Sequence, residues 1–155
     1  MGLSLAAIGA RVLRTRSLVR APIALYRAGL GWLLGGRIMM LEHRGRSSGL
    51  RRYVCLEVVE RPGPGRIVIV SGFGERAQWY RNLRAHPRCF VSTGRVRRAP
   101  ARARLLGEEE SAAALDRYRR ARPRDWELLR GAIERATGQP VRGLPMVELR
   151  LRRRR

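Results

Sequence analysis

Short apolar runs separated by turn residues constrain the fold of this chain more than any other feature. Runs rich in β-branched and aromatic residues, bounded by turn residues, are typical of strands. Pro62-Gly63-Pro64-Gly65 and Thr93-Gly94 are strong turn signals between neighbouring runs. Pro100 indicates a bulge or an edge, because proline cannot donate a ladder hydrogen bond. The strands expected on this basis lie at 38–43, 53–60, 66–71, 89–93, 95–106 and 146–151.

Helical patterns accompany these strands at the start, in the middle and near the end of the chain. Residues 75–85 form a short helix, and the acidic run that begins at Glu108 starts another, which stops at Pro123. Residues 126–136 repeat apolar side chains at helical spacing and follow as a further helix. Together with strands joined largely by hairpins, these helices predict an α+β domain around an antiparallel barrel. In the last strand, Glu148 is expected to point outward.

The first 41 residues are basic and carry no acidic side chain. Their six arginines lie at positions 11, 14, 16, 20, 27 and 37. In residues 1–22 apolar side chains recur at helical spacing, with the arginines mostly on the other side, and Pro22 interrupts the pattern. We therefore divide the chain into a basic amphipathic segment at 1–22, a barrel domain at 23–151 and a basic tail at 152–155.

Two interpretations of residues 1–22 carry about equal weight. A basic amphipathic helix can lie on an anionic membrane surface, or it can pack on the core with its arginines in water. No apolar run approaches the ~20 residues that span a bilayer, and the arginines follow the first apolar run, unlike in a cleavable signal peptide. A mitochondrial transit peptide is a minority alternative. We expect a cytoplasmic protein with a peripheral contact to the inner face of the plasma membrane.

The charge balance favours anionic partners. The chain has 34 basic residues, all of them arginine, against 12 acidic ones, which gives a formal charge of +22. Nucleic acid, an acidic membrane face and a phosphorylated cofactor are the candidates. A nucleic-acid-binding protein with salt-sensitive affinity is one hypothesis. It is the less favoured one, because the arginines are spread over the whole chain and aromatic residues are not interleaved with them.

No constellation of side chains for unaided catalysis stands out. His43 and His86 lack a partner at metal-ligand spacing, so no metal site is expected. Cys55 and Cys89 lie in apolar runs, where a buried free thiol is the default. The chain has no nucleophile elbow, no Walker loop and no paired-carboxylate pattern. If the chain is an enzyme, a bound cofactor must therefore supply the difficult chemistry.

A glycine- and arginine-rich loop at 44–52 stands between the first two expected strands. Glycines let consecutive backbone N–H groups point into one hollow, and serine hydroxyls add donors there. Arginine forks match the oxygens of a phosphate in bidentate fashion. The loop predicts an anion cradle suited to the phosphate of a cofactor, with a solvated hairpin loop as the alternative interpretation.

Three ordered motifs carry a resemblance to a known family. One is Leu33-Leu34-Gly35-Gly36-Arg37 with the loop after it, another is Ile67–Gly74, and the most specific is Gln78–Pro87, which contains Trp-Tyr-Arg-Asn-Leu. With the strand Val147-Glu148-Leu149 they cover roughly residues 23–151. This order resembles the deazaflavin (coenzyme F-420)-dependent nitroreductase family of split-barrel oxidoreductases, which share a glycine-arginine-x-serine-glycine loop and a tryptophan-tyrosine-x-asparagine-leucine helix.

The resemblance implies a six-stranded antiparallel split β-barrel with flanking helices and coenzyme F-420 as the cofactor, with FMN as the alternative. The loop would hold the cofactor phosphate, the positive field would favour its oligoglutamate tail, and the backbone at Ser71–Gly74 would approach the flat ring. Trp79 and Leu83 would pack the helix on the barrel, and Asn82 would bond backbone at the helix end. The cofactor-binding residues implied in this way are Gly45, Arg46, Ser47, Ser48, Gly49, Arg51, Arg52, Ser71, Gly72, Phe73 and Gly74.

The reaction implied is hydride transfer from the reduced deazaflavin to a planar acceptor such as a quinone, an enone or a nitroaromatic. The protein would position the acceptor and stabilise the charge that develops on its oxygen. A membrane-bound amino-terminal segment would make a lipid quinone the natural substrate. A barrel that carries a cofactor or lipid without turnover is an alternative. No catalytic residue is assigned, since a proton donor could be any of the four phenols, Tyr26, Tyr53, Tyr80 and Tyr118.

Overall fold

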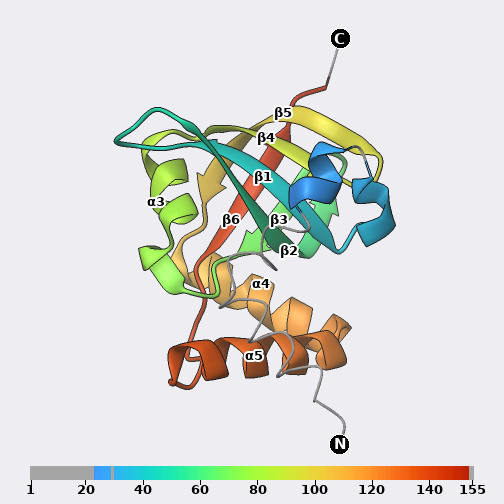
Figure 1. Ribbon diagram of the computed structural model, residues 1–155. Helices are drawn as coiled ribbons and strands as arrows, with labels where there is room; N and C mark the ends of the chain where they lie inside the picture. Colours follow the sequence, from blue (N-terminus) through green and yellow to red (C-terminus); the bar gives the residue numbers. More distant parts are fainter. Residues whose placement is uncertain (1–22, 29, 154–155) are drawn as a thin grey trace, which may run out of the picture.

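The computed structural model describes residues 23–28 and 30–153 and shows a closed β-barrel (Figure 1). Six antiparallel strands close it in the order β1-β2-β3-β6-β5-β4. This confirms the predicted fold class. The strands are β1 (Ile38–Arg44), β2 (Arg51–Gly63), β3 (Arg66–Val70), β4 (Arg88–Thr93), β5 (Val96–Leu105) and β6 (Met146–Leu151), and the helices are η1 (Gly31–Leu34), η2 (Gly74–Arg76), α3 (Gln78–Ala85), α4 (Glu108–Ala121) and α5 (Pro123–Thr137), with residues 23–27 also helical.

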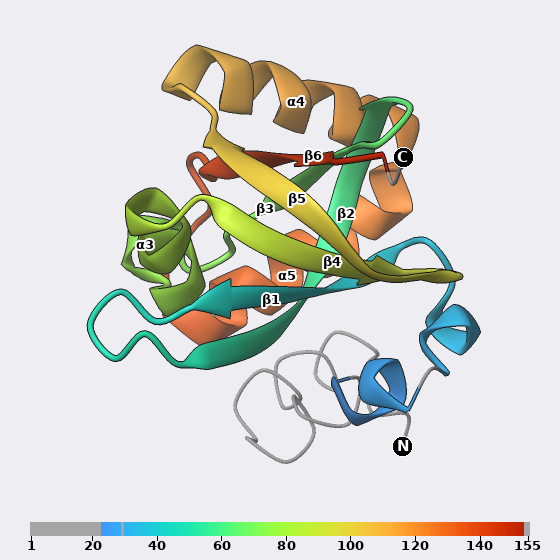
Figure 2. The ribbon, with the colours of Figure 1, turned by 90° about the horizontal axis from the view of Figure 1, so that it is seen from above.

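The interior of the barrel is filled by alternate residues of each strand and closed by α3. Met39 and Leu41 of β1 belong to the same buried cluster as Ile67 and Ile69 of β3, since residues two apart point to one face of a strand. Trp79, Tyr80 and Leu83 of α3 join that cluster. The helix thus packs its apolar side on the barrel through Trp79 and Leu83, as predicted, and Figure 2 shows it at one end of the strands.

A second core lies outside the barrel, where α4 and α5 cover the outward face of β3 and β6. Val68 and Met146 from these strands pack with Tyr118 of α4 and with Trp126 and Ile133 of α5. The two helices lie together on one side of the barrel (Figure 1). Tyr118 and Trp126 are therefore packing residues. The outward face of β1, β4 and β5 is left without these helices (Figure 2).

Several boundaries differ from the sequence prediction. The helix expected at 75–85 is divided into η2 and α3 at Ala77, whose ψ of 132° is extended. β2 continues through Gly63, so that only Pro64 and Gly65 form the turn before β3. The bulge lies near Arg98, which has a φ of 45°, and not at Pro100, which pairs regularly with Phe90. The closed barrel also gives Pro100 no open edge to occupy.

Glu148 lies on the outward face of β6, but it is not solvated as an outward acid would be. It is 2% exposed, and three arginines from three strands cover it. Arg66 Nη2 lies 2.5 Å from Oε2, Arg150 Nε 2.7 Å from Oε1 and Arg104 Nε 3.8 Å from Oε1. Burial raises the pKa of Glu148, but hydrogen bonds from Arg150 and Arg66 outweigh it and hold the pKa below its ordinary value. This carboxylate is therefore a shared counter-charge for arginines of β3, β5 and β6.

Within residues 23–28 and 30–153, no helix combines the length and the apolarity needed to cross a membrane. The predicted membrane-surface segment at 1–22 lies outside the described residues.

Replacement of Glu148 by glutamine should destabilise the fold by about 2–3 kcal/mol, because it leaves three arginines without their shared buried counter-charge. Urea unfolding at pH 7 measures the loss. The control is Glu127→Gln, which breaks an ion pair with Arg130 on the exposed side of α5 and should change the stability much less. Equal losses in the two variants would contradict a special role for Glu148.

Candidate active site

The loop between β1 and β2 is a closed turn with a defined shape. The Gly45 N–H donates to the Leu50 carbonyl over 2.9 Å, and the Gly49 N–H donates to the Gly45 carbonyl over 2.8 Å. Gly49 has a φ of +69°, in the left-handed region that favours glycine. A Cβ at Gly45 would come within 2.5 Å of Ser48 Oγ. The backbone at Gly49 thus favours glycine, and the Ser48 hydroxyl occupies the space beside Gly45.

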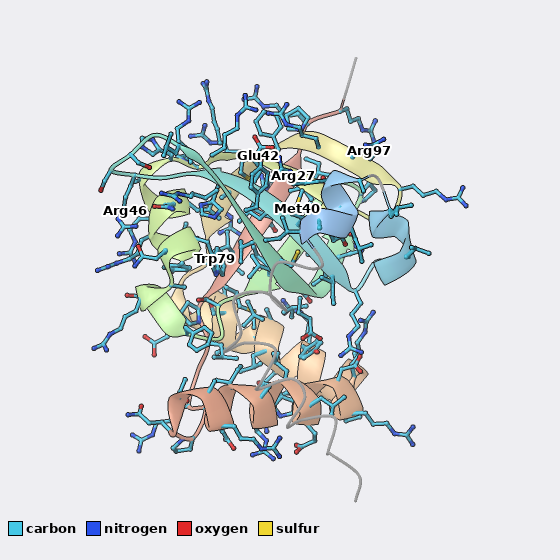
Figure 3. All side chains as sticks on the ribbon, viewed as in Figure 1. Arg27, Met40, Glu42, Arg46, Trp79 and Arg97 are labelled. Carbon is cyan, nitrogen blue, oxygen red and sulfur yellow. The ribbon has the colours of Figure 1, made fainter. Side chains whose placement is uncertain are left out.

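A cleft of about 520 Å³ opens between this loop, the start of β2 and α3. Its lining includes five of the residues implied by the resemblance: Gly45, Arg46, Ser47, Ser48 and Arg52. The remaining lining residues are His43, Tyr53, Val54, Gln78, Trp79 and Asn82. Figure 3 shows Arg46 beside α3 and Trp79 on that helix. The structure therefore brings the predicted loop and the most specific sequence motif together in one cavity.

Arg46 is held against α3 by two of its nitrogens. Its backbone N–H donates to Asn82 Oδ1 over 3.1 Å, and its Nη1 donates to the same oxygen and to Gln78 Oε1, each over 2.9 Å. Asn82 was predicted to bond backbone at the end of its own helix. It bonds backbone in the opposite wall of the cleft instead, because its buried side chain faces the loop. Asn82 thereby fixes the loop relative to the helix.

The same amide determines which ring nitrogen of His43 carries the proton. Since Asn82 Oδ1 accepts from Arg46, its Nδ2 must face His43 Nδ1, which lies 3.1 Å away. An N–H donor at that distance requires an unprotonated Nδ1, so the imidazole carries its proton on Nε2. Burial, followed by the positive charge of Arg52, lowers the pKa of His43 to about 4. His43 is therefore a neutral side chain in the wall of the cleft at neutral pH.

The cleft is cationic and has no acidic lining. Arg46 and Arg52 bring two guanidinium groups to it, Ser47 and Ser48 bring hydroxyls, and no carboxylate lines it. Within the described part of the chain, Arg52 makes no ion pair and no side-chain hydrogen bond, and Nε and Nη2 of Arg46 are likewise unused. This donor set fits a phosphate group, which accepts from guanidinium forks and hydroxyls. No three potential metal ligands gather anywhere in the described residues.

Two of the implied loop residues do not line the cleft. Gly49 serves the turn itself. Arg51 points to the opposite face of β2 from Arg52, because side chains alternate along a strand, and its Nε lies 3.8 Å from Glu42 Oε1. Arg51 therefore lines a separate groove on the outward face of the barrel.

The segment Ser71–Gly74 also lies away from the cleft. Gly72, Phe73 and Gly74 line a different hollow of about 640 Å³ beside the carboxyl end of α5. The Ser71 hydroxyl donates to the Gly74 carbonyl over 2.6 Å, and a Cβ on Gly72 would come within 3.2 Å of Ile133. Packing against α5 explains why residue 72 is glycine, and a contact of this segment with a cofactor ring stays a prediction.

The four phenols are no longer equivalent. The Tyr26 hydroxyl donates to the Ile38 carbonyl, and that of Tyr118 donates to Glu57 Oε1 over 2.7 Å. Tyr80 is buried in the barrel core. Tyr53 borders the cleft, but it is paired with Glu42 and so shares the outward face of β2, with the Arg27 guanidinium 5.3 Å from its ring. None of the four is thus placed as an evident proton donor.

The cysteines are free thiols and offer no nucleophile. Burial raises the pKa of Cys55 and of Cys89 to about 12, so both stay protonated at neutral pH. The lining residues that the sequence did not assign to ligand binding are His43, Tyr53, Val54, Gln78, Trp79 and Asn82. Two of them, Trp79 and Asn82, belong to the tryptophan-tyrosine-x-asparagine-leucine motif, to which the sequence analysis had given structural roles only.

Because His43 is buried and neutral, the free energy of unfolding should decrease at acidic pH. Its pKa is about 4 in the folded chain against an ordinary 6.5, so the unfolded chain binds the proton first and stability falls as pH falls from about 6.5 to 4. We expect a loss of at most about 3 kcal/mol over this range from His43. Urea unfolding at pH 7 and pH 4.5 measures it, and His43→Gln should reduce the difference, whereas His86→Gln, at an exposed histidine, should not.

The chain is similar in sequence and in fold to known proteins. Residues 18–143 match the family described as F420H(2)-dependent quinone reductase. No curated protein matches the chain. Among solved structures, one described as an F420-H2 dependent reductase (FDR-A) is 25% identical, covering 73% of this chain and 93% of its own, with a TM-score of 0.49.

Two further solved structures have the same fold. A domain-swapped dimer is 23% identical over 83% of this chain and 99% of its own, with a TM-score of 0.54. The protein Atu2129 of Agrobacterium tumefaciens, of unknown function, is 18% identical over 85% of this chain and 55% of its own, with a TM-score of 0.53. The family match confirms the resemblance and names the predicted cofactor, coenzyme F-420. The chain belongs to the F420H(2)-dependent quinone reductase family, whose split-barrel members are deazaflavin-dependent oxidoreductases.

Proposed function

We propose that this protein transfers hydride from reduced coenzyme F-420 to a quinone, with the reaction taking place at the cleft between the β1–β2 loop and α3. The observation that carries the proposal is the composition of the cleft, which combines two arginines and two serines with an indole and no carboxylate. A phosphorylated cofactor with a flat ring requires both kinds of surface. An enone or a nitroaromatic is the alternative acceptor.

The loop would hold the phosphate of the cofactor. Within residues 23–28 and 30–153, the Arg52 guanidinium has no partner and Nε and Nη2 of Arg46 are unused, so both side chains can form charge-assisted hydrogen bonds without breaking these contacts. Ser47 and Ser48 add hydroxyl donors from the turn. Because Asn82 and Gln78 already hold Arg46, little side-chain entropy is lost when the phosphate binds.

The apolar wall of the cleft would receive the flat part of the cofactor and exclude water. Val54 faces the barrel interior, and Trp79 is largely buried with part of its surface in the cleft. The bound deazaflavin supplies the hydride chemistry itself. The chain would then position the acceptor and stabilise the negative charge that develops on its oxygen. Ser71, Gly72, Phe73 and Gly74 remain candidates for contact with the ring.

Binding of the oxidised cofactor, followed by its fluorescence, tests the site. Arg46→Ala/Arg52→Ala should weaken binding about 100-fold, since two charge-assisted hydrogen-bonding groups are removed. Arg52→Ala alone keeps the clamp to Asn82 intact and should still weaken it about 10-fold. The control is Arg120→Ala/Arg124→Ala, which removes the same charge from exposed arginines near the α4–α5 junction. A similar weakening in the control would remove the assignment of the phosphate to this loop. FMN measured alongside tests the selectivity for deazaflavin.

The acceptor can be tested together with the predicted membrane contact of residues 1–22. Substitution of Arg11, Arg14, Arg16 and Arg20 by glutamine in the full chain should abolish sedimentation with anionic vesicles, because each arginine near such a surface contributes about 1 kcal/mol. Turnover of a long-chain lipid quinone presented in those vesicles should then fall at least tenfold. Turnover of a water-soluble short-chain quinone should not change. Unaltered sedimentation and lipid-quinone turnover would exclude the membrane contact and leave the reductase proposal standing.

A further inference from the structure

The outward face of the barrel carries a second cationic hollow, distinct from the cleft. A groove of about 630 Å³ runs over β1, β4 and β5 beside the β1–β2 loop. Figure 2 looks onto this face, where β4 and β5 lie side by side and no labelled helix covers them. The groove is lined by Glu42, His43, Arg44, Arg51, His86, Pro87, Arg88, Cys89, Phe90, Arg98 and Arg102. Five arginines thus share it with one carboxylate.

That carboxylate is already occupied. Arg98 donates to Glu42 from Nε over 2.9 Å and from Nη2 over 3.0 Å, and Arg51 approaches the same group at 3.8 Å. The Arg98 guanidinium also lies 3.9 Å from the ring centre of Phe90, so the only aromatic face in the groove is covered. Glu42 therefore cannot neutralise Arg44, Arg88 and Arg102.

No other carboxylate side chain of the protein compensates these three arginines. All 12 acidic residues lie between positions 42 and 148, inside the described ranges, and none of them forms an ion pair with Arg44, Arg88 or Arg102. The three guanidinium groups also make no side-chain hydrogen bond to any described residue. Three charged donor groups in one hollow thus lack an acceptor.

The strand register adds a specific electrostatic cost. Arg88 stands directly opposite Arg102 across β4 and β5, and Arg44 stands directly opposite Arg51 across β1 and β2. Like charges directly opposite each other on neighbouring strands are destabilising. Two such pairs border the same groove, which is the arrangement that a bound anion would relieve.

Arg88 and Arg102 belong to a longer row of four arginines that face one another across neighbouring strands, and the two ends of this row differ. The row runs Arg88, Arg102, Arg150, Arg66 across β4, β5, β6 and β3. At its β6–β3 end, buried Glu148 bonds both Arg150 and Arg66. At its β4–β5 end no carboxylate stands between Arg88 and Arg102. One end of the row carries a built-in counter-ion, and the other end has the same charges around an open groove.

We propose that the groove is a second anion site, which takes the phosphate group of a phosphorylated small molecule or of a phospholipid headgroup. Side chains directly opposite on neighbouring strands stand about 5 Å apart at Cβ, so the Arg88 and Arg102 forks can grip one phosphate between them. Arg44 reaches the same hollow from β1. This site is independent of the proposed reductase activity, because it lies on the other side of β1 and β2 from the cleft and shares only His43 with it.

Calorimetric titration with pyrophosphate at constant ionic strength tests the proposal. The wild-type protein should bind about two equivalents, one in the cleft and one in the groove. Arg88→Ala/Arg102→Ala and Arg46→Ala/Arg52→Ala should each lose one equivalent, whereas the charge-matched Arg120→Ala/Arg124→Ala should keep both. If the groove variant binds as many equivalents as the charge-matched control, the proposal is overturned. Deazaflavin binding should stay unchanged in the groove variant, which separates this result from a failure of the cleft assignment.

A second measurement guards against a variant that fails to fold and identifies the source of the phosphate. In chloride buffer at low ionic strength, the groove variant should melt at least as high as the charge-matched control, because a like-charge pair has been removed. A large drop in its melting temperature together with unchanged pyrophosphate binding would contradict the proposal.

Sedimentation with phosphatidylglycerol vesicles identifies the source of the phosphate. Sedimentation that weakens severalfold only in the groove variant assigns the site to a headgroup. Equal sedimentation in both variants, with one pyrophosphate lost, assigns it to a soluble phosphorylated molecule.

Discussion

The position of the candidate site depends on one buried amide. Asn82 accepts two hydrogen bonds from Arg46 with its oxygen and donates to His43 with its nitrogen. It thereby connects a helix, a loop and a strand that are far apart in the sequence. The amide can do this because it presents an acceptor and a donor in fixed directions. An ionised carboxylate has no donor, and the hydrogen of a hydroxyl rotates freely. The position of the loop beside α3 and the tautomer of the imidazole both follow from these contacts.

Charge imbalance is the second constraint on the structure. Twelve carboxylates cannot pair one to one with 34 arginines, and two buried carboxylates each serve several guanidinium groups. Glu148 serves Arg66, Arg104 and Arg150, and Glu42 serves Arg98 and Arg51. Both carboxylates are nearly fully buried among outward-facing arginines. Among the described arginines that form no ion pair, Arg46 and Arg52 line the cleft, and Arg44, Arg88 and Arg102 line the groove.

Local pattern predicted much of the fold, because the strands, turns and helix ends depend on residues close in sequence. Apolar runs bounded by turn residues predicted all six strands, and the glycine-arginine loop lies where the cleft is. Contacts between distant elements could not be read in this way. Asn82 looked like a helix-end residue because its partner Arg46 lies 36 positions earlier. Ser71–Gly74 was grouped with the loop through the resemblance alone, and the structure lines it against α5.

The separation of Arg51 from Arg52 shows how a single step in register divides the chemistry of the barrel. Both arginines follow the same loop, and the sequence analysis gave them one role. A strand turns successive side chains to opposite faces, so β2 sends Arg52 to the cleft and Arg51 to the outward groove. Arg44, the last residue of β1, also faces the groove, whereas Arg46 lies in the loop beyond the strand and faces the cleft. The cleft and the groove therefore lie on opposite faces of β1 and β2. His43 lies between them, where burial and the charge of Arg52 lower its pKa and keep the imidazole neutral at neutral pH.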